Sequence, residues 1–390
     1  MRIGYVVGSF PNRSETFIIR EVTALAAEGL EVVVLPLWRC REPARWAGTL
    51  PEPARWRISG QLAMVSRPQP GTFWRLYFTR RLLRKPRVAV SALAHLGEAF
   101  AMAAWVRDHG LERLHAHFAN LPSTVGWVAA DVAGRPFTMS VHARDVFVEP
   151  QFLAEKAQAA LAVVACNSAA ADRCREVAGA SSSGKIHLIP HGLPLEDYRF
   201  RGRHKSDRPL LVASGRLVEK KGFAWLIRAL EILRRRHVHL RCWIVGDGPL
   251  RKSLAREAER FAVADIVEFK GWLPHGEAVA TYRQADAFVA PSVVARDGDR
   301  DGLPNTVVEA AALGVPLVTT NVGGLGDLVR DGETGLVAEP GDAASLAARL
   351  DEALSDPEAA YRRAEHARAE VEARFDQKAT IPALIEILTA

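Results

Sequence analysis

Short apolar, β-branched runs alternate with longer stretches of helical periodicity along most of the chain. In the first half, the apolar runs fall at 3–7, 32–35, 114–117, 137–141 and 162–166. The longer stretches between them include 16–28, 97–109 and 123–133. This alternation predicts βαβ units, in which a parallel sheet carries helices on both faces.

A second series of the same kind follows a polar segment. Residues 190–209 hold Pro194, Gly202 and a cluster of Arg, His and Lys, a composition typical of a linker. Beyond it, apolar runs repeat at 210–213, 240–245, 267–269, 287–290 and 316–319. A chain of 390 residues also exceeds what one hydrophobic core usually supports. We therefore expect an α/β protein with two domains, 1–195 and 209–373, and a final helix over 374–390.

Composition excludes several classes of protein. With 48% apolar and 25% charged residues, the chain is neither disordered nor fibrous. Its start runs straight into a strand pattern without the apolar region of a signal peptide. No run approaches the roughly 18 uncharged apolar residues of a spanning helix, so we expect a cytoplasmic location. The four cysteines lack any C-x-x-C spacing, which argues against a zinc site.

The net charge of +6 is concentrated in the first half of the chain. Within residues 67–87, seven Arg and Lys are interleaved with four aromatic residues and no acid intervenes. Such a segment suits peripheral attachment to an anionic membrane surface. A solvated basic helix is an equal alternative. Binding of nucleic acid is not expected, because no nucleic-acid motif accompanies the basic segment.

Residues 301–309 combine an acidic loop with a helix start directly after the apolar run 287–291. Asp301 and Glu309 flank Pro304, which is favoured at the beginning of a helix. The amides that follow, including that of Val307, can meet phosphate, and the carboxylates can hold sugar hydroxyls. The preceding Asp297 and Asp299 resemble the opening of a calcium loop, but the closing Glu would be needed at Val308. We expect a polar loop of an active site and no metal.

Several motifs coincide in order and spacing with those of one known family. They are Ser214 to Gly222, Ile244 to Pro249, Phe269 to Trp272, Pro291-Ser292, Asp301 to Glu309 and Asn321 to Gly324. They resemble the second domain of retaining glycosyltransferase family 4, whose GT-B fold consists of two facing Rossmann-like doubly wound domains with a cleft between them. In the first half, Ser14 to Ile18, Leu114 to Phe118 and Ser140 to Asp145 resemble the branch that builds exopolysaccharides and lipopolysaccharides, colanic-acid-type enzymes among them.

The resemblance implies that residues 1–195 bind the acceptor and 209–373 the nucleotide sugar, with the helix over 374–390 packing back towards the first domain. It assigns Arg216 and Lys221 to the leaving diphosphate, and His142, at a strand end, to the donor sugar and diphosphate. Asp301 stands where relatives usually carry Glu beside the reacting carbon, and it is shorter by one methylene. His115 and His117, on the run 114–117, are expected on opposite sides of their strand.

The remaining candidates also follow from the resemblance. Glu309 is expected to hold a ribose. The other donor contacts are Gly8, Gly271, Trp272, Gly302, Leu303, Pro304, Asn305 and Thr306. The acceptor contacts are Phe10, Arg13, Glu15 and Thr16. Several have plain structural alternatives: Trp272 as core packing, and Glu15 and Thr16 as the start of a helix.

Together these features predict a retaining glycosyltransferase that moves a hexose from a UDP- or GDP-linked donor to a hydroxyl of a lipid-linked or polysaccharide acceptor in cell-surface glycan biosynthesis. No tightly bound cofactor and no metal are expected. The alternative from another class is a non-catalytic, nucleotide-sugar-binding partner of a membrane polysaccharide complex. A phosphorylase that uses pyridoxal phosphate is a weaker alternative.

Overall fold

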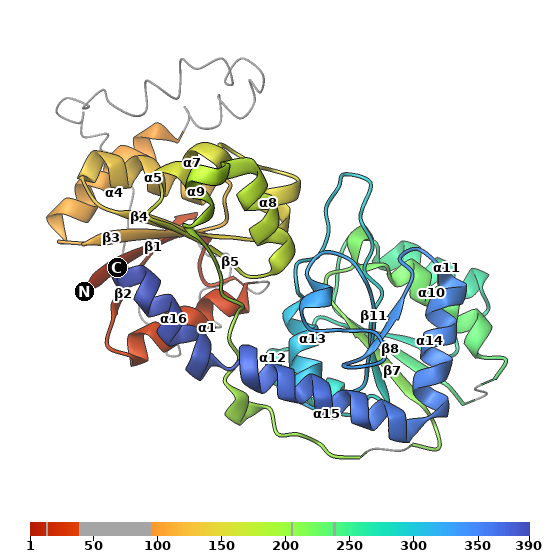
Figure 1. The fold of residues 1–390 in the computed structure, drawn as a ribbon. Coiled ribbons are helices and arrows are strands. Elements are labelled where there is room, and N and C mark those ends of the chain that lie inside the picture. The colour runs from red at the N-terminus through yellow and green to blue at the C-terminus, as the bar shows by residue number, and fades with distance from the viewer. Residues whose placement is uncertain (13–14, 39–94, 204–205, 237–238) are drawn as a thin grey trace. The chain divides into compact units, whose positions relative to one another are not determined.

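The chain forms two compact units that are each described by themselves. The computed structural model describes residues 1–12, 15–38, 95–203, 206–236 and 239–390. Unit 1 comprises Met1–Gly192 and Thr380–Ala390, and unit 2 comprises Leu193–Ala379. Both are α/β units in which helices cover both faces of a parallel sheet (Figure 1). Arg13, the basic segment 67–87 and Cys40 lie outside the described residues.

Unit 1 contains a six-stranded sheet in the order β2-β1-β3-β4-β5-β6, and every pairing is parallel. The strands are β1 (Arg2–Ser9), β2 (Glu31–Trp38), β3 (Arg113–His117), β4 (Phe137–Val141), β5 (Ala162–Ala165) and β6 (Ile186–Leu188). The helices are α1 (Thr16–Ala27), α4 (Leu96–Asp108), α5 (Leu121–Ala133), α6 (Ala143–Phe147), α7 (Leu153–Ala159), α8 (Ser168–Ala178), α9 (Ala180–Ser183) and α16 (Gln377–Thr389). The central strands β3, β4 and β5 are buried along their whole length, as expected for a sheet covered on both faces.

Two apolar clusters fill the two sides of this sheet. One includes Met102 of α4, Val125 of α5 and Met139 of β4. The other joins Tyr5 of β1 to Leu384 of α16, with Ile18, Val22 and Leu25 of α1. Each fully buried Leu or Val contributes about 1.5–3 kcal/mol to folding, so α16 is part of the core of unit 1.

Unit 2 contains a second parallel sheet, in the order β12-β11-β10-β7-β8-β9. Its strands are β7 (Leu210–Ser214), β8 (Arg241–Val245), β9 (Val267–Gly271), β10 (Ala287–Ala290), β11 (Leu317–Thr320) and β12 (Leu336–Ala338). If β7 is counted as the first strand, this is the strand order of a Rossmann sheet. In such a sheet the order of successive strands reverses between the first and the fourth strand. Here that reversal lies between β7 and β10, which pair directly.

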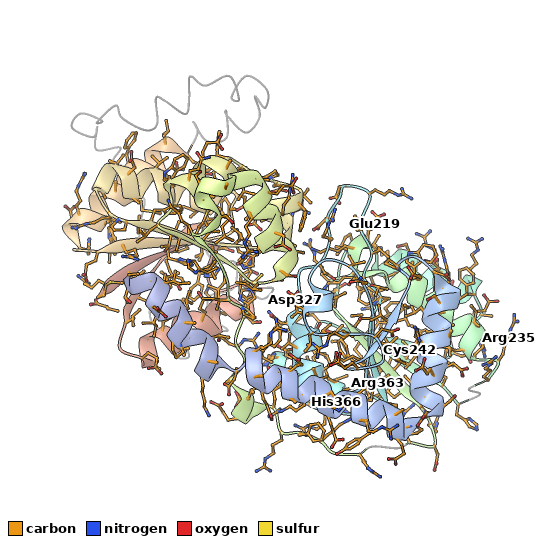
Figure 2. The ribbon with its side chains drawn as sticks, in the orientation of Figure 1. Glu219, Arg235, Cys242, Asp327, Arg363 and His366 are labelled. Carbon is orange, nitrogen blue, oxygen red and sulfur yellow. The ribbon has the colours of Figure 1, made fainter. Side chains whose placement is uncertain are left out.

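The helices of unit 2 divide between the two faces of its sheet. Their bounds are α10 (Phe223–Leu233), α11 (Arg251–Arg260), α12 (His275–Tyr282), α13 (Asn305–Ala312), α14 (Ala343–Ser355) and α15 (Pro357–Arg374). One cluster holds side chains of α12, α13 and α15, and the other holds those of α10, α11 and α14. Cys242 on β8 lies inside the second cluster, whereas Arg235, with 78% of its side chain exposed, points outward (Figure 2).

The segment expected as a linker packs largely within unit 2. Leu193, Leu195 and Tyr198 are buried in a core cluster of that unit. Burial of these apolar side chains fixes the segment to unit 2, although its composition is mainly polar. Leu193 also forms a parallel bridge with Asp376. The Leu193 amide donates to the Phe375 carbonyl at 2.8 Å, and the Gln377 amide donates to the Leu193 carbonyl at 2.9 Å. The two places where the chain passes between units therefore lie side by side.

A search of the described residues finds no helix that is long and apolar enough to span a membrane.

Candidate active site

The reversal of strand order in unit 2 brings two loops together at the carboxyl ends of β7 and β10. Open α/β sheets bind ligands at this point, because the chain leaves neighbouring strands in opposite directions and opens a crevice. After β7 come Gly215, Arg216 and a 3₁₀ turn over Glu219–Lys221. After β10 the chain runs through Pro291 and Ser292 to the acidic loop and α13. The loops touch where the Val293 amide donates to the Lys220 carbonyl at 2.8 Å.

Two lysines of the first loop face two aspartates of the second. Lys221 Nζ lies 3.0 Å from Asp301 Oδ2, and Lys220 Nζ lies 3.1 Å from Asp299 Oδ1 and 3.8 Å from Asp301 Oδ1. Asp301 is 5% exposed and Asp299 is 8% exposed. Burial of charged groups is costly unless they are paired, so the two loops hold each other through these ion pairs.

Asp301 is also held in place by a chain of two neutral hydroxyl groups. Ser292 Oγ donates to Asp301 Oδ2 at 2.6 Å, and the hydroxyl of Thr320 at the end of β11 donates to the Ser292 carbonyl at 2.5 Å. Both hydroxyl groups belong to buried residues. Each oxygen of the Asp301 carboxylate therefore has its own ion-pair or hydrogen-bond partners. These partners fix the side chain in the absence of a ligand.

Two glycines permit the close approach of these loops. Gly222 has a positive φ, and a Cβ there would lie 1.7 Å from the Pro291 carbonyl oxygen. Gly323 has a φ of +62°, and its Cβ would lie 1.8 Å from the Asp301 carbonyl oxygen. Neither position has room for a side chain, and both conformations favour glycine.

Helix α13 follows the acidic loop and begins after Pro304, which occupies the position before the first helical residue. The Pro304 carbonyl accepts from the Val307 amide at 3.0 Å. The expectation of a phosphate contact from Val307 is therefore wrong, because that amide already has an acceptor. Among the described residues, the amides of Asn305 and Thr306 have no backbone acceptor.

Glu309 lies one turn further along α13 and is 4% exposed. Burial, followed by the charge of Glu309, raises the pKa of Tyr282 above its ordinary value. Tyr282 in turn shares a hydrogen bond of 2.7 Å with the hydroxyl of Ser214, at the end of β7. The carboxylate predicted to hold a ribose thus lies near the same strand ends as Lys221.

A small pocket joins these groups within unit 2. It has an empty volume of about 200 Å³ including its open mouth, and Ser214, Lys221, Ser292, Pro304 and Thr306 are among its lining residues. One wall carries a cation, one carries hydroxyls and one is the start of α13. This combination suits a ligand with an anionic group, since cations and helix amides both attract negative charge.

The other predicted residues of unit 2 lie at the ends of β7, β9 and β10 or in the loops that follow them. Arg216 is exposed and makes no ion pair within the described part of the chain. Gly302 accepts from the Gly324 amide at 3.3 Å, and Leu303 packs partly buried against the core. Gly271 ends β9 with a φ of +72°. Trp272 is 42% exposed, so the alternative of core packing for Trp272 is wrong.

In unit 1, His142 directly follows β4 and precedes α6. Its ring lies 4.4 Å from Phe118, 5.1 Å from Phe17 and 5.3 Å from His191, measured between centroids. Both ring nitrogens are buried without a hydrogen-bond partner among the described residues. Burial, followed by the neighbouring His191, lowers the pKa of His142 well below its usual value, so the ring is neutral at neutral pH.

The backbone of His142 is held by a buried carboxylate. Asp145 Oδ1 accepts from the His142 amide at 2.9 Å, and Asp145 Oδ2 accepts from the Ala119 amide. Burial raises the pKa of Asp145 to about 7. Lys156, also fully buried, donates to the Ala119 carbonyl and to Ser123 Oγ, both at 2.7 Å. The loops after β3 and β4 are therefore tied together beneath the His142 ring.

The predicted contacts near the start of the chain are arranged around the end of β1. Gly8 leaves room for Trp38, whose ring would lie 3.0 Å from a Cβ at that position. Phe10 is 3% exposed and packs in the core. Glu15 precedes α1 and accepts from Asn12 Nδ2 at 2.9 Å, and burial raises the pKa of Glu15 to about 7. Thr16 is the first residue of α1.

The two histidines of β3 lie on the same side of the sheet, which corrects the expectation that they face opposite sides. Residues two apart in a strand line one face, and the rings of His115 and His117 are 5.2 Å apart. His115 bonds the hydroxyls of Thr138 at 2.9 Å and Ser140 at 3.0 Å. His117 Nε2 donates to Glu21 Oε1 at 3.0 Å.

Sequence reasoning missed Glu21 and His191 as members of this cluster. Burial raises the pKa of Glu21, but the charge and hydrogen bond of His117 outweigh it and bring the pKa to about 2. Glu21 follows Ile18 by three residues and precedes Leu25 by four, so it shares the apolar face of α1. An acidic residue on the apolar face of a helix was the feature of the sequence that could have revealed this cluster. His191 lies after β6, a strand that the pattern did not predict.

Comparison with known proteins identifies the family. Residues 195–370 match the family described as "Glycosyl transferases group 1". A glycogen synthase of Mycobacterium tuberculosis is 32% identical, covering 94% of this chain and 88% of its own. A putative colanic acid biosynthesis glycosyltransferase of Salmonella typhimurium is 28% identical, covering 90% of each chain.

A solved structure of similar fold is that of the Anabaena protein HepE in complex with UDP-glucose. It has a TM-score of 0.71 and 19% identity, and it covers 100% of this chain and 99% of its own. The fold, the family match and the full-length relatives agree with the motifs after β7 and β10. The chain therefore belongs to the group 1 glycosyl transferases and has the GT-B fold of two Rossmann-like units.

Proposed function

We propose that the protein is a retaining hexosyltransferase that takes its sugar from a nucleoside diphosphate and transfers it to a hydroxyl of a lipid-linked or polysaccharide acceptor. The observation that carries the proposal is the pair of Lys221 and Asp301, 3.0 Å apart at the reversal of strand order, beside the start of α13. A cation, a carboxylate and helix amides at one point match a donor that carries a diphosphate and sugar hydroxyls.

In this mechanism Lys221 and Arg216 neutralise the diphosphate as it leaves. Preorganised charges of this kind are usually the largest contribution to catalysis, because they need no reorganisation during the reaction. The amides of Asn305 and Thr306 are directed to the same phosphates. Glu309 accepts hydroxyl groups of the ribose, and Asp301 contacts the hexose while it holds Lys221. His142 of unit 1 contacts the donor sugar, and Glu15 and Thr16 meet the acceptor.

The biological context proposed is the synthesis of cell-surface glycan. The Salmonella relative is named for colanic acid biosynthesis and covers nearly the full length of this chain. The relative from Mycobacterium is named a glycogen synthase, which supports transfer of a hexose to a saccharide. UDP-glucose, present in the HepE structure, is the first donor to test, followed by GDP-linked hexoses.

The test is a screen of UDP- and GDP-linked hexoses by thermal unfolding and slow donor hydrolysis. A ligand at 100 times its Kd stabilises the native state by about 2.7 kcal/mol. We expect one donor to raise the melting temperature and to be hydrolysed, and with an acceptor to give a product of unchanged anomeric configuration by NMR. Binding without turnover against a panel of saccharide acceptors would instead favour the non-catalytic partner. No stabilisation by any donor or nucleotide would overturn the proposal.

We further propose that residues 67–87 attach the protein to an anionic membrane surface. Support comes from the sequence, in which Arg80, Arg81, Arg84 and Lys85 closely follow the aromatic residues of 73–78. Each basic residue near such a surface contributes about 1 kcal/mol. Replacing these four by Gln is therefore expected to weaken sedimentation with phosphatidylserine vesicles by at least 100-fold. Replacing the three exposed basic residues of α11, Lys252, Arg256 and Arg260, is the control, and equal loss in both variants would contradict the proposal.

A further inference from the structure

Three neighbouring strands of unit 1 are each followed by a residue of a type that can bind metals. His142 directly follows β4, Cys166 directly follows β5, and His191 lies three residues after β6. These strands are adjacent and parallel. Their carboxyl ends therefore meet at one edge of the sheet, and residues separated by up to 49 positions in the sequence come together there.

The three side chains are close enough to share one ion. One ring nitrogen of His142, one of His191 and the sulfur of Cys166 all lie within 4.8 Å of one another. Zinc bound at 2.0–2.1 Å to nitrogen and 2.3 Å to sulfur needs ligand atoms roughly 3.3–3.6 Å apart. The ligand atoms must therefore approach one another by up to about 1.5 Å when an ion binds.

His142 is the most informative of the three. Both of its ring nitrogens are buried and lack a hydrogen-bond partner among the described residues. A buried polar atom without a partner costs about 1–3 kcal/mol, and a bound cation would remove part of that cost. Imidazole in its neutral form binds a metal through the ring nitrogen that carries no proton.

The surroundings support such a site. Asn167 Nδ2 donates to Cys166 Sγ at 3.3 Å, and Asn167 Oδ1 accepts from the Ala170 amide at the start of α8. The amide that contacts the sulfur is therefore fixed by helix capping. Phe17 lies 4.1 Å from the His191 ring and Phe118 lies 4.4 Å from the His142 ring. Apolar walls and a donor to the sulfur are typical of the outer shell of a metal site.

We propose that His142, Cys166 and His191 form a binding site for one Zn²⁺ or a similar borderline-soft divalent cation. Two imidazoles and a thiolate suit such ions, and three protein ligands leave a fourth position for water. Binding replaces the thiol proton of Cys166, which is released to solvent. This revises the expectation from cysteine spacing, because C-x-x-C patterns detect ligands on one loop and these ligands come from three.

A second group of similar composition, Glu21 with His115 and His117, is a weaker candidate. His115 already bonds Thr138 and Ser140 through its two nitrogens. Glu21 Oε1 already accepts from His117 and from the Tyr5 hydroxyl at 2.8 Å. An ion there would have to break several side-chain hydrogen bonds at once.

Zinc at this site would also occupy the ring that is directed to the donor in the proposed function. Zinc is therefore expected to inhibit transfer, and this consequence rests on the proposed function. The proposed binding of zinc does not depend on the proposed function. The two are separated by measuring cation binding directly, in protein without donor or acceptor.

The experiment titrates Co²⁺ into the full-length chain, freed of metal and carrying no histidine tag. A tetrahedral thiolate site gives a thiolate-to-cobalt absorption band, and we expect it to saturate at one equivalent and to disappear on addition of Zn²⁺. Cys166→Ser should remove the band, and His191→Gln should weaken cobalt binding at least tenfold. Cys174→Ser, which changes a buried cysteine of α8 outside the cluster, should retain the band, as should Glu21→Gln. Circular dichroism establishes that each variant is folded.

Absence of a saturable band in the wild-type protein would overturn the proposal. So would a band that survives in Cys166→Ser, or one that is lost in Glu21→Gln while that variant stays folded. If Cys166→Ser does not fold, His191→Gln and its effect on cobalt affinity decide the question.

Discussion

Lys221 is held by a carboxylate of the protein before any donor binds. Its ammonium lies 3.0 Å from Asp301 and its side chain is 16% exposed, so it has lost most of its water. A diphosphate that enters the pocket meets a cation that is already desolvated and oriented, which is the condition under which electrostatic stabilisation is strongest. Asp301 Oδ2 is shared by Ser292 and Lys221, so the same carboxylate oxygen holds both partners in place.

Replacing Lys221 by Ala is therefore expected to lower kcat/KM for transfer about 10²- to 10³-fold. The fold should survive, because Lys220 and Ser292 remain as partners of the Asp301 carboxylate when Lys221 is removed. Steady-state kinetics with the donor found in the screen provides the measurement. Lys252→Ala, an exposed cation of α11 in the same unit, is the matched control. Equal rates for the two variants would contradict the role of Lys221.

His115 gives a second prediction at this scale, about pH. Burial lowers the pKa of His115 to about 3, whereas the unfolded chain has the ordinary value near 6.5. The unfolded state thus binds more protons between these values, so the contribution of His115 is intact above pH 6.5 and is lost as pH falls towards 3. The slope for one such group approaches about 1.4 kcal/mol per pH unit.

The measurement is urea unfolding of the wild type and of His115→Gln at pH 7.5 and pH 5. Glutamine does not titrate, so the wild type should lose roughly 2 kcal/mol more than the variant between the two values. Comparing the two proteins cancels the titration of Glu15, whose raised pKa acts in the opposite direction. Parallel losses in both proteins would rule out His115 as the titrating group.

At the scale of elements, the site depends on backbone contacts between loops. The loop after β11 packs against the acidic loop at Gly323, where a Cβ would lie 1.8 Å from the Asp301 carbonyl oxygen. Asp301 is consequently positioned by the backbone of a different strand end as well as by Ser292. A change at Gly323 should therefore reach the donor site without touching a charged group.

Gly323→Ala is expected to destabilise the protein by about 2–4 kcal/mol through the steric clash and the positive φ. It should also weaken donor binding, because the Asp301 loop must move. Gly276→Ala is the control, since a Cβ there meets nothing within 4 Å and lies in α12. That variant should be unchanged or more stable by up to about 1 kcal/mol. The midpoint of urea unfolding tests both, and a Gly323→Ala protein as stable as the wild type would sink the argument.

The longer elements could be predicted from sequence because their apolar runs are buried on both faces of a sheet. β6 and β12 were missed, since strands of three residues are too short for a pattern to stand out. Motifs after β7 and β10 pointed to Lys221, Asp301 and Pro304, which the structure brings together at these strand ends, and their contact with a donor stays a prediction. The sequence did not predict the ion pair between Lys220 and Asp299 or the hydrogen bond from Thr320 to Ser292. These contacts join residues that are 79 and 28 positions apart. Their partners are chosen by the packing of loops, which local patterns do not encode.

At the scale of the whole molecule, unit 1 contains the last residues of the described chain. Leu388 is fully buried beside β1 and α1 in its core. Removal of a buried Leu side chain costs about 2–5 kcal/mol. Leu388→Ala should therefore destabilise unit 1 and leave unit 2 unchanged, although Leu388 follows unit 2 in the sequence.

Limited proteolysis with mass spectrometry can assign the effect. In Leu388→Ala, cleavage should increase within 1–192, and a fragment close to 193–379 should persist. Leu161→Ala removes a leucine of unit 1 that is 46% exposed and should leave the pattern of the wild type. Faster cleavage within 193–379 in Leu388→Ala would show that the two units do not unfold separately.

The return of α16 to unit 1 has a consequence for the order in which the protein is made. β1 and α1 leave the ribosome before unit 2, but the helix that covers them follows only after the residues of unit 2 have been synthesised. Translation proceeds at about 5–20 residues per second. The apolar side chains of Tyr5, Ile18 and Val22 therefore remain without the covering helix α16 for roughly tens of seconds. Unit 2, continuous from 193 to 379, can complete its own core earlier. Apolar surface of unit 1 is thus exposed for longer during translation than that of unit 2, which can fold as it emerges.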